Sequence, residues 1–419
     1  MMVDEILKSL RKLGIEEWKI IEKNVESKEM FFIKKILDMN RAKKVRKYEL
    51  TVYKKFKEDG KNYMGSSSIK IHPTMSQNEI EKTIKKAIFA ADFVKNEPYP
   101  IAKPRKKDVR KPLSVLEKVD GVIEAILVDN DKAWINSAEM FLTTENVRIL
   151  NSTGLDVSYN HEKLEIEFIT TSKGKEEVEL YHDIKTSNLS PESISSRVLD
   201  ALKITADRAA ARSTPKIKDI PIIFDESGTK EIMSYYLEKA SAMNVYEQMS
   251  NAKIGDKFHA PITLYIDPTI EGSYFSVPFD NDGVELKKVK IIDNGKLLTY
   301  WGNLRFSHYL NTNPTGNMTN FSVDPGKKSI DELRSGRYIE LKSFSDFQMN
   351  ALTGDFAGEI RLGWYYDGEK KIPVTGGSVS GNIKDVQETL ELSKETVQEG
   401  NYYGPKALKI HGAKIAGVI

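Results

Sequence analysis

Residues 220–243 read IPIIFDESGTKEIMSYYLEKASAM, a mainly apolar run followed by a helical pattern. The run at 220–224 predicts a buried strand, because short apolar runs with polar boundaries are typical of strands covered on both faces. Asp225 and Glu226 follow directly, and acidic side chains stabilise the first turn of a helix. The sequence therefore predicts a strand that passes into a helix. The chain beyond reads mainly as strands and loops rich in Gly, Asn and Thr.

Two stretches before this segment, residues 1–95 and 113–215, each run from strands into a long helix. In the first we predict a helix at 4–13, strands at 18–22, 29–38, 45–57 and 63–71, and a helix capped by Ser76 with Glu79 three residues later. In the second we predict helical sequence at 113–130, strands at 133–144, 147–150, 155–171 and 176–184, and a helix from Ser190-Pro191 to before Pro215. A regular strand–helix–strand alternation is missing, so the expected fold class is α+β.

The chain has 419 residues, which is too many for one ordinary core. The stretch 96–112, NEPYPIAKPRKKDVRKP, holds four prolines and six Lys or Arg and reads as a linker. We therefore expect three regions. Residues 1–112 form an N-terminal α+β domain that ends in the basic linker, 113–219 a middle α+β region, and 220–419 a C-terminal mainly-β domain.

Charge is nearly balanced, with 63 Lys and Arg against 61 Asp and Glu. A nucleic-acid-binding protein usually has a larger basic excess, and the basic run of the linker contains no interleaved aromatic residue, so no nucleic-acid partner is expected. The chain has no cysteine, which fits a reducing compartment. No stretch approaches the roughly 20 apolar residues of a membrane span, and the first residues lack the apolar run of a signal peptide. We expect a cytoplasmic protein without a membrane partner.

Metal-binding and catalytic motifs are not recognisable. The six histidines are far apart in sequence, whereas a helical metallopeptidase site needs two imidazoles on neighbouring turns. Distant histidines could still converge in space. Asp280-Asn281-Asp282-Gly283 hints at a calcium loop, but Pro278 and Val289 occupy ligand positions, so we interpret it as a tight turn. The Gly-rich segment 375–382 lacks the Lys of a phosphate-binding loop.

Several segments in a fixed order resemble the TldD/PmbA family, once called modulators of DNA gyrase. The segment at 279–284 is similar to the family's F-D-D-E-G turn, 291–297 to its I-x-N-G-x-L hairpin, and 315–317 to its T-G-N loop. Further segments at 150–154, 351–356, 373–374 and 380–382 resemble the family's N-S-x-G, V-T-G-D-F, P-V and G-N motifs. Each motif is short, and their common order makes the set specific.

The resemblance implies an α+β fold, dimeric assembly and a division of function. TldD-type chains carry a His-Glu-x-x-x-His motif at a helix start and a later Cys as zinc ligands, whereas PmbA-type chains lack them. Here Asp225 and Lys230 occupy the two histidine positions and Glu226 the position of the base. A protonated Lys cannot bind zinc. The resemblance therefore predicts no catalytic residue, no metal ligand and no cofactor in this chain.

Three functions follow as hypotheses. The first is a PmbA/TldE-like pseudo-peptidase subunit that joins a TldD-like catalytic chain and acts on unstructured peptides. The second is a metallopeptidase with a non-standard metal site, and the third is a homodimeric peptide-binding protein without catalysis. Aromatic residues are frequent after residue 270, which favours a dimer built through the C-terminal region. The family-motif turns are expected to line a substrate channel, through Asp280, Asp282, Gly283, Gly316, Asn317, Gly354 and Asp355.

Overall fold

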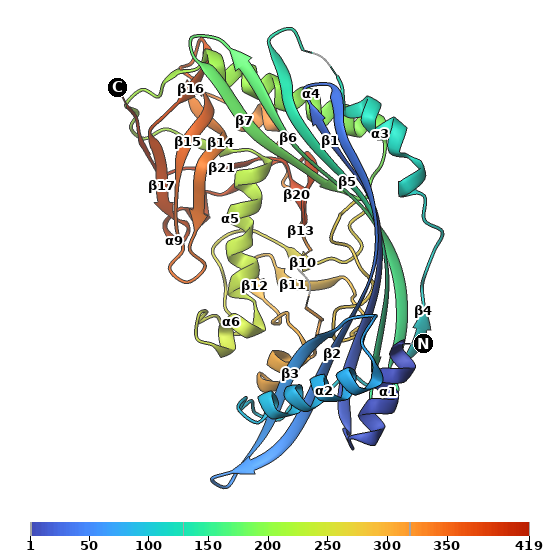
Figure 1. The fold of residues 1–419 in the computed structure, drawn as a ribbon. Helices are drawn as coiled ribbons and strands as arrows, with labels where there is room; N and C mark the ends of the chain where they lie inside the picture. Colours follow the sequence, from blue (N-terminus) through green and yellow to red (C-terminus); the bar gives the residue numbers. More distant parts are fainter. Residues whose placement is uncertain (1, 129, 318–319, 419) are drawn as a thin grey trace.

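The computed structural model describes residues 2–128, 130–317 and 320–418. Its first sheet has, among these residues, seven strands in the order β3-β2-β1-β5-β6-β4, with β7 paired to β6. In Figure 1 the long strands curve along one side of the molecule, and the C-terminal half lies inside the curve. The strands are β1 (Glu17–Ile33), β2 (Ile36–Glu58), β3 (Lys61–Ile71), β4 (Lys106–Asp108), β5 (Ala133–Asn151), β6 (Asp156–Lys173) and β7 (Glu177–Thr186).

Hairpin turns connect β1 to β2, β2 to β3, β5 to β6 and β6 to β7, and the first of them corrects a prediction. The turn between β2 and β3 falls between the strands predicted at 45–57 and 63–71, and it has positive φ at Asp59 and Gly60. The strand predicted at 29–38 is wrong, because the chain turns at Lys34, where φ is 56°, and residues 36–38 return in β2. Neither Gly nor Pro marks this turn, so the sequence pattern gave no indication of it.

Helices cover the two ends of the first sheet. Near one end lie α1 (Met2–Lys12) and α2 (Gln77–Ala91), whose predicted capping box between Ser76 and Glu79 is confirmed. Helices α3 (Val119–Ile126) and α4 (Pro191–Ala210) cover the other end (Figure 1). The helical sequence predicted at 113–130 is reduced to α3 and a short 3₁₀ turn, Val115–Glu117. Phe93 lies beyond the end of α2 and is exposed.

The linker stretch 96–112 adds β4 to the sheet, parallel to β6. Two of its cations, Arg105 and Lys107, form ion pairs with Glu285 at 2.7 and 2.5 Å. Strands from residues 1–112 and from 113–219 thus share one sheet; the proposed division of the chain into three domains remains a prediction.

The C-terminal half contains two further sheets. One holds β10 (Leu264–Ile266), β11 (Val289–Asp293), β12 (Lys296–Leu297), β13 (Phe321–Val323), β19 (Thr396–Glu399) and β20 (Tyr402–Pro405). The other holds β8 (Arg212–Ser213), β9 (Ile222–Phe224), β14 (Tyr338–Met349), β15 (Asp355–Tyr366), β16 (Lys371–Thr375), β17 (Ser378–Asn382), β18 (Glu391–Leu392), β21 (Leu408–Ile410) and β22 (Lys414–Ala416). The predicted α+β class is confirmed.

Helix α5 (Glu226–Lys239) belongs to the core of this half. Its side chains Ile232, Met233 and Tyr236 are fully buried in one cluster with residues of both sheets. Shorter helical segments are α6 (Ala242–Tyr246), α7 (Leu304–Tyr309), α8 (Ile330–Leu333), α9 (Ile383–Val386) and a 3₁₀ turn, Gln387–Thr389. Among the described residues, no helix has the length and apolar content needed to cross a membrane.

Candidate functional site

Strand β9 and the first turn of α5 position Asp225 and Glu226. Ile222, Ile223 and Phe224 are fully buried, because β9 lies between β14 and β21. Asp225 caps the helix, and its Oδ1 accepts the backbone N–H of Gly228 at 3.2 Å. A Cβ on Gly228 would lie 2.8 Å from the Phe224 ring, so only glycine lets the helix start this close to the strand. The local sequence thus fixes both carboxylates at one end of β9.

A β-bulge in β14 places Lys342 beside them. Leu341 pairs with Phe224 of β9 on one side and with Gly363 of β15 on the other. Ser343 pairs with Leu362, the neighbour of Gly363, so Lys342 is an extra residue in β14. A bulge changes the direction of a side chain relative to the regular alternation of a strand. Lys342 consequently reaches the start of α5.

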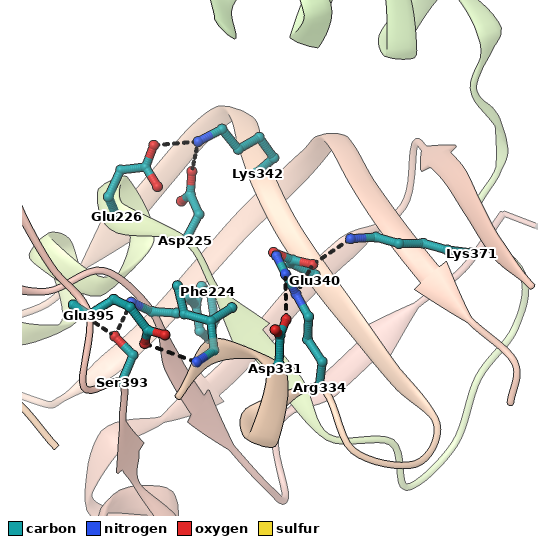
Figure 2. A network of polar contacts seen from close by, with 12 residues as sticks. Phe224, Asp225, Glu226, Asp331, Arg334, Glu340, Lys342, Lys371, Ser393 and Glu395 are labelled. Carbon is teal, nitrogen blue, oxygen red and sulfur yellow. Dashed lines mark hydrogen bonds and ion pairs between the residues drawn. The ribbon is translucent and has the colours of Figure 1, made fainter. Parts of the chain in front are cut away.

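Lys342 contacts both acidic side chains. Its Nζ lies 2.8 Å from Asp225 Oδ2 and 2.5 Å from Glu226 Oε1, as Figure 2 shows. Only 6% of the Asp225 side chain and 17% of the Lys342 side chain are exposed. One buried ammonium group is therefore paired with two carboxylates.

The charges of these three groups follow from their burial. Burial raises the pKa of Asp225 to about 7, although Lys342 acts in the opposite direction. Burial also raises the pKa of Glu226, but Lys342 outweighs it and the pKa lies below its ordinary value. For Lys342, burial is outweighed by Asp225 and Glu226, and the pKa lies above its ordinary value. Near neutral pH, Glu226 and Lys342 are an ion pair and Asp225 holds a proton part of the time.

These donors do not fit a zinc ion. Zinc in proteins is bound by His, Cys and carboxylate groups, and here the carboxylates are held by an ammonium group that repels a cation. Lys230, at the position of the second histidine of the family motif, points elsewhere: a Cβ on Gly400 would be 3.4 Å from its Nζ. In residues 2–128, 130–317 and 320–418, no three His, Asp or Glu side chains form a group that could hold a metal ion.

A cleft of about 630 Å³ opens beside Lys342, and we call it the Lys342 cleft. Its walls come from β7 and α4 on one side and from β14 and β15 on the other. His182 lines it, but the Thr170 hydroxyl lies 2.9 Å from Nε2 and the Phe168 ring stacks on the imidazole. Burial lowers the pKa of His182 to about 4, so the ring is neutral near pH 7. The imidazole is thus part of the wall.

A second polar network lies close by (Figure 2). The Glu340 carboxylate accepts hydrogen bonds from Arg334 Nη2 at 2.5 Å and from Lys371 Nζ at 2.8 Å. Arg334 and Lys371 hold the pKa of Glu340 below its ordinary value despite its burial, which alone would raise it. Here one carboxylate is paired with two cations, whereas at Lys342 one cation is paired with two carboxylates.

Asp280 joins two of the predicted family-motif turns. Its Oδ1 accepts the N–H groups of Asp282 and Val284, both at 2.9 Å, and its Oδ2 accepts the N–H of Asn317 at 2.8 Å. Burial raises the pKa of Asp280 to about 6. A Cβ on Gly316 would lie 2.2 Å from Leu286 Cδ2, and the φ of this residue is 87°, so the loop needs glycine here.

The joined turns lie against the first sheet. Asp282 accepts a hydrogen bond from Lys19 Nζ at 2.5 Å, and a Cβ on Gly283 would lie 2.3 Å from Leu155. Gly354 and Asp355 lie in a different place: Gly354 ends the turn between β14 and β15, and Asp355 is the first residue of β15, where Asn382 Nδ2 donates to it at 2.7 Å. The seven predicted residues thus form two groups, and the substrate channel remains a prediction.

Sequence reasoning did not identify Lys342 or His182. Lys342 lies 116 residues after Glu226, and the two meet only through the parallel pairing of β9 with β14. A bulge has no sequence motif of its own here, so nothing in the chain marks Lys342 among its many lysines.

The C-terminal half matches a known domain. Residues 217–417 match the model of the PmbA/TldA metallopeptidase C-terminal domain. A zinc metalloprotease TldD homolog of Saccharolobus solfataricus is 27% identical over 246 residues, which cover 49% of this chain and 54% of that one. A metalloprotease PmbA homolog of Buchnera aphidicola is 25% identical over 299 residues, covering 68% and 66%. The chain belongs to the TldD/PmbA family.

Further similarities extend beyond that half. An uncharacterized protein of Methanocaldococcus jannaschii is 28% identical over 302 residues, covering 68% of this chain and 70% of that protein. The structure of TldE from Thermococcus kodakarensis has the same fold, with a TM-score of 0.78, 20% identity, and 99% and 100% of the two chains covered. A Thermotoga maritima protein named as a modulator of DNA gyrase gives a TM-score of 0.78 at 18% identity, with 99% of each chain covered.

Proposed function

We propose that this protein is a PmbA/TldE-like pseudo-peptidase subunit that joins a TldD-type metallopeptidase acting on unstructured peptides. The observation that carries the proposal is the contact of Lys342 with both Asp225 and Glu226. In a TldD-type chain these positions belong to zinc ligands and a catalytic base. In this chain a fixed ammonium group lies there, and it excludes a second cation by charge repulsion.

The Glu226 carboxylate also cannot serve as a general base. A general base must lie within hydrogen-bonding distance of the proton of an attacking nucleophile and accept that proton. The Glu226 Oε1 instead contacts Lys342, which lowers the pKa of the carboxyl and makes it a weaker base. The chain therefore contributes walls and binding surface to the complex, and its partner contributes the chemistry.

Co-purification from the native cell tests this proposal. We expect the chain to retain a partner that carries His-Glu-x-x-x-His, and the mixture to cleave a denatured test protein that this chain alone leaves intact. Glu226→Gln in this chain should leave the activity of the mixture unchanged. Cleavage by the isolated chain that disappears in Glu226→Ala would contradict the proposal.

Two other outcomes correspond to the rival functions. Elemental analysis that finds about one tightly held zinc per isolated chain would favour a metallopeptidase with a non-standard site. Recovery of this chain only with copies of itself, with peptide binding and no cleavage, would favour a homodimeric peptide-binding protein.

A further inference from the structure

The Lys342 cleft continues into a second hollow of about 470 Å³. Ser345 and Arg361 line both, so the two form one groove along β15. The second hollow also contains Arg208 from the last turn of α4 and the turn at residues 375–378. We call it the arginine end of the groove.

Two guanidinium groups with unused hydrogen-bonding capacity face the arginine end. Arg361 Nη2 donates one hydrogen bond, to the backbone carbonyl of Glu179 at 3.2 Å. Arg208 Nε is buried and, in the described part of the chain, has no hydrogen-bond partner. Burial and the nearby charge of Arg361 both lower the pKa of Arg208, with Glu176 acting weakly in the opposite direction. A buried donor without a partner is costly, and such groups commonly mark a missing ligand or water.

In the described part of the chain, the acidic side chains around the arginine end form no ion pair with Arg208 or Arg361. Glu359 lines the same hollow, but within the residues described it forms no ion pair with either guanidinium. The Glu179 carboxylate accepts a hydrogen bond from Asn136 Nδ2 at 2.7 Å. In the adjoining Lys342 cleft, Glu399 is paired with Arg197 at 2.8 Å. An incoming anion would therefore meet two unpaired cations and one exposed acid.

Hydroxyl groups line the path between Lys342 and the arginines. Ser343 Oγ is a second buried polar atom without a partner among the described residues, and it faces the Lys342 cleft. Ser345 follows at the junction, and Ser378 lies in the arginine end. Leu362 opposes Ser343 and Glu359 opposes Ser378, so the groove follows three residue steps of β15, or roughly 10 Å.

We propose that Arg208 and Arg361 bind the C-terminal carboxylate of a peptide that lies extended in this groove. The inference rests on the proposed function, because it names the end of the peptide that the pseudo-peptidase subunit holds. A guanidinium group binds a carboxylate with two parallel hydrogen bonds, which suits a planar anion better than a lysine does. About three peptide residues fit between the arginine end and Lys342.

Peptide binding to the full chain tests the inference. One fluorescent ten-residue peptide of Gly, Ser and Ala is made with a free C-terminal carboxylate and again with a C-terminal amide. Fluorescence anisotropy should show at least 10-fold tighter binding of the acid. Arg208→Gln and Arg361→Gln should each remove the difference, whereas Arg337→Gln, an exposed arginine bonded to the Tyr365 hydroxyl, should keep it. Thermal unfolding checks that each variant is folded.

Other outcomes separate the possible failures. Equal binding of acid and amide by the unmodified chain overturns the inference and leaves the proposed function in place. An amide-ended peptide with one internal Glu that binds as tightly as the acid overturns the assignment to the C-terminus. If neither peptide binds, the inference is overturned, whereas the proposed function still rests on the Lys342 contact and on co-purification. Thermal shift with acetate then shows whether the arginine end binds a carboxylate. No acetate stabilisation, or equal stabilisation in Arg208→Gln, overturns that site as well.

Discussion

Lys342 is the residue on which the candidate site depends, because its ammonium group neutralises two carboxylates that are otherwise buried together. Replacement by methionine keeps most of the side-chain volume and removes the charge. We expect Lys342→Met to lower the free energy of unfolding by about 3–5 kcal/mol at pH 8, as for other broken buried ion pairs. Chemical denaturation at pH 8 and pH 5 measures the change.

The pH dependence of this variant follows from the carboxyl groups. Burial raises the pKa of Asp225, so the native state binds more protons than the unfolded state between about pH 4 and pH 7. Stability therefore falls as the pH rises through this window, and the fall should be steeper without Lys342. The loss at pH 5 should be smaller than at pH 8. Lys57→Met, at an exposed position, is the control; equal losses at both pH values in Lys342→Met would contradict this account.

His182 gives the opposite pH dependence. Burial lowers its pKa to about 4, so the unfolded state binds the additional proton first as the pH falls below about 6.5. Its contribution to stability is complete above that pH and is lost progressively down to pH 4. His182→Gln should flatten the decline of the thermal midpoint between pH 6.5 and pH 4. His72→Gln, at an exposed site, serves as the comparison, and an unchanged slope in His182→Gln would rule out this role.

At the scale of elements, local chemistry decided what the sequence could predict. The capping box at Ser76 and the proline start of α4 depend on residues within one helical turn, and both were predicted correctly. The turn at Lys34 carries no Gly or Pro, so the strand there was predicted wrongly. The bulge at Lys342 lies in the pairing of β14 with β15 and has no sequence motif, and the pairing of β9 with β14 joins segments more than 100 residues apart. Asp225 and Glu226 were thus found, and their partner was not.

Strand β2 has a free edge whose charge we expect to prevent aggregation. Its residues 48–58 pair with β3, but residues 36–47 pair only with β1 in the described structure. Exposed cations crowd this free part, which discourages the addition of another chain's strand. They are Arg41, Lys43, Lys44, Arg46 and Lys47.

Neutralising three of these cations tests the idea. The combined change Lys43→Thr, Lys44→Thr and Lys47→Thr raises strand propensity and removes three charges, so we expect turbidity to appear at lower protein concentration. The control removes the same charge from an exposed helix face through Lys82→Gln, Lys85→Gln and Lys86→Gln. Equal solubility of the two triple variants would show that only net charge matters.

At the scale of the whole molecule, the property to test is whether two chains associate through the C-terminal region. Many aromatic residues of the C-terminal region fill its own core, among them Tyr300, Trp301 and Phe306. Exposed apolar side chains remain in this region at Met243, Met249, Ile254 and Leu298. The net charge of +2 gives little long-range repulsion between chains.

We expect light scattering at micromolar concentration to report about twice the chain mass of 47.5 kDa. The change Met249→Lys with Ile254→Lys should shift the particle toward the monomer, because charges are unfavourable in the buried centre of an interface. Lys82→Glu with Lys85→Glu, on the exposed face of α2, is the control. A monomer for the unmodified chain, with no partner recovered from cells, would remove the assembly from the proposed function.

The order of strands in the first sheet has a consequence during synthesis. β1 pairs with β5, and the two meet between Ile33 and Ser137, so about 100 residues must be added after β1 before its partner exists. Ribosomes add roughly 5–20 residues per second, so this interval lasts about 5–20 s. During that time β1 is paired with β2 on one side only, and its other edge is open to other nascent chains. A factor that binds unpaired strands near the ribosome exit would therefore cover the open edge of β1 during this interval and lower the chance that nascent chains aggregate.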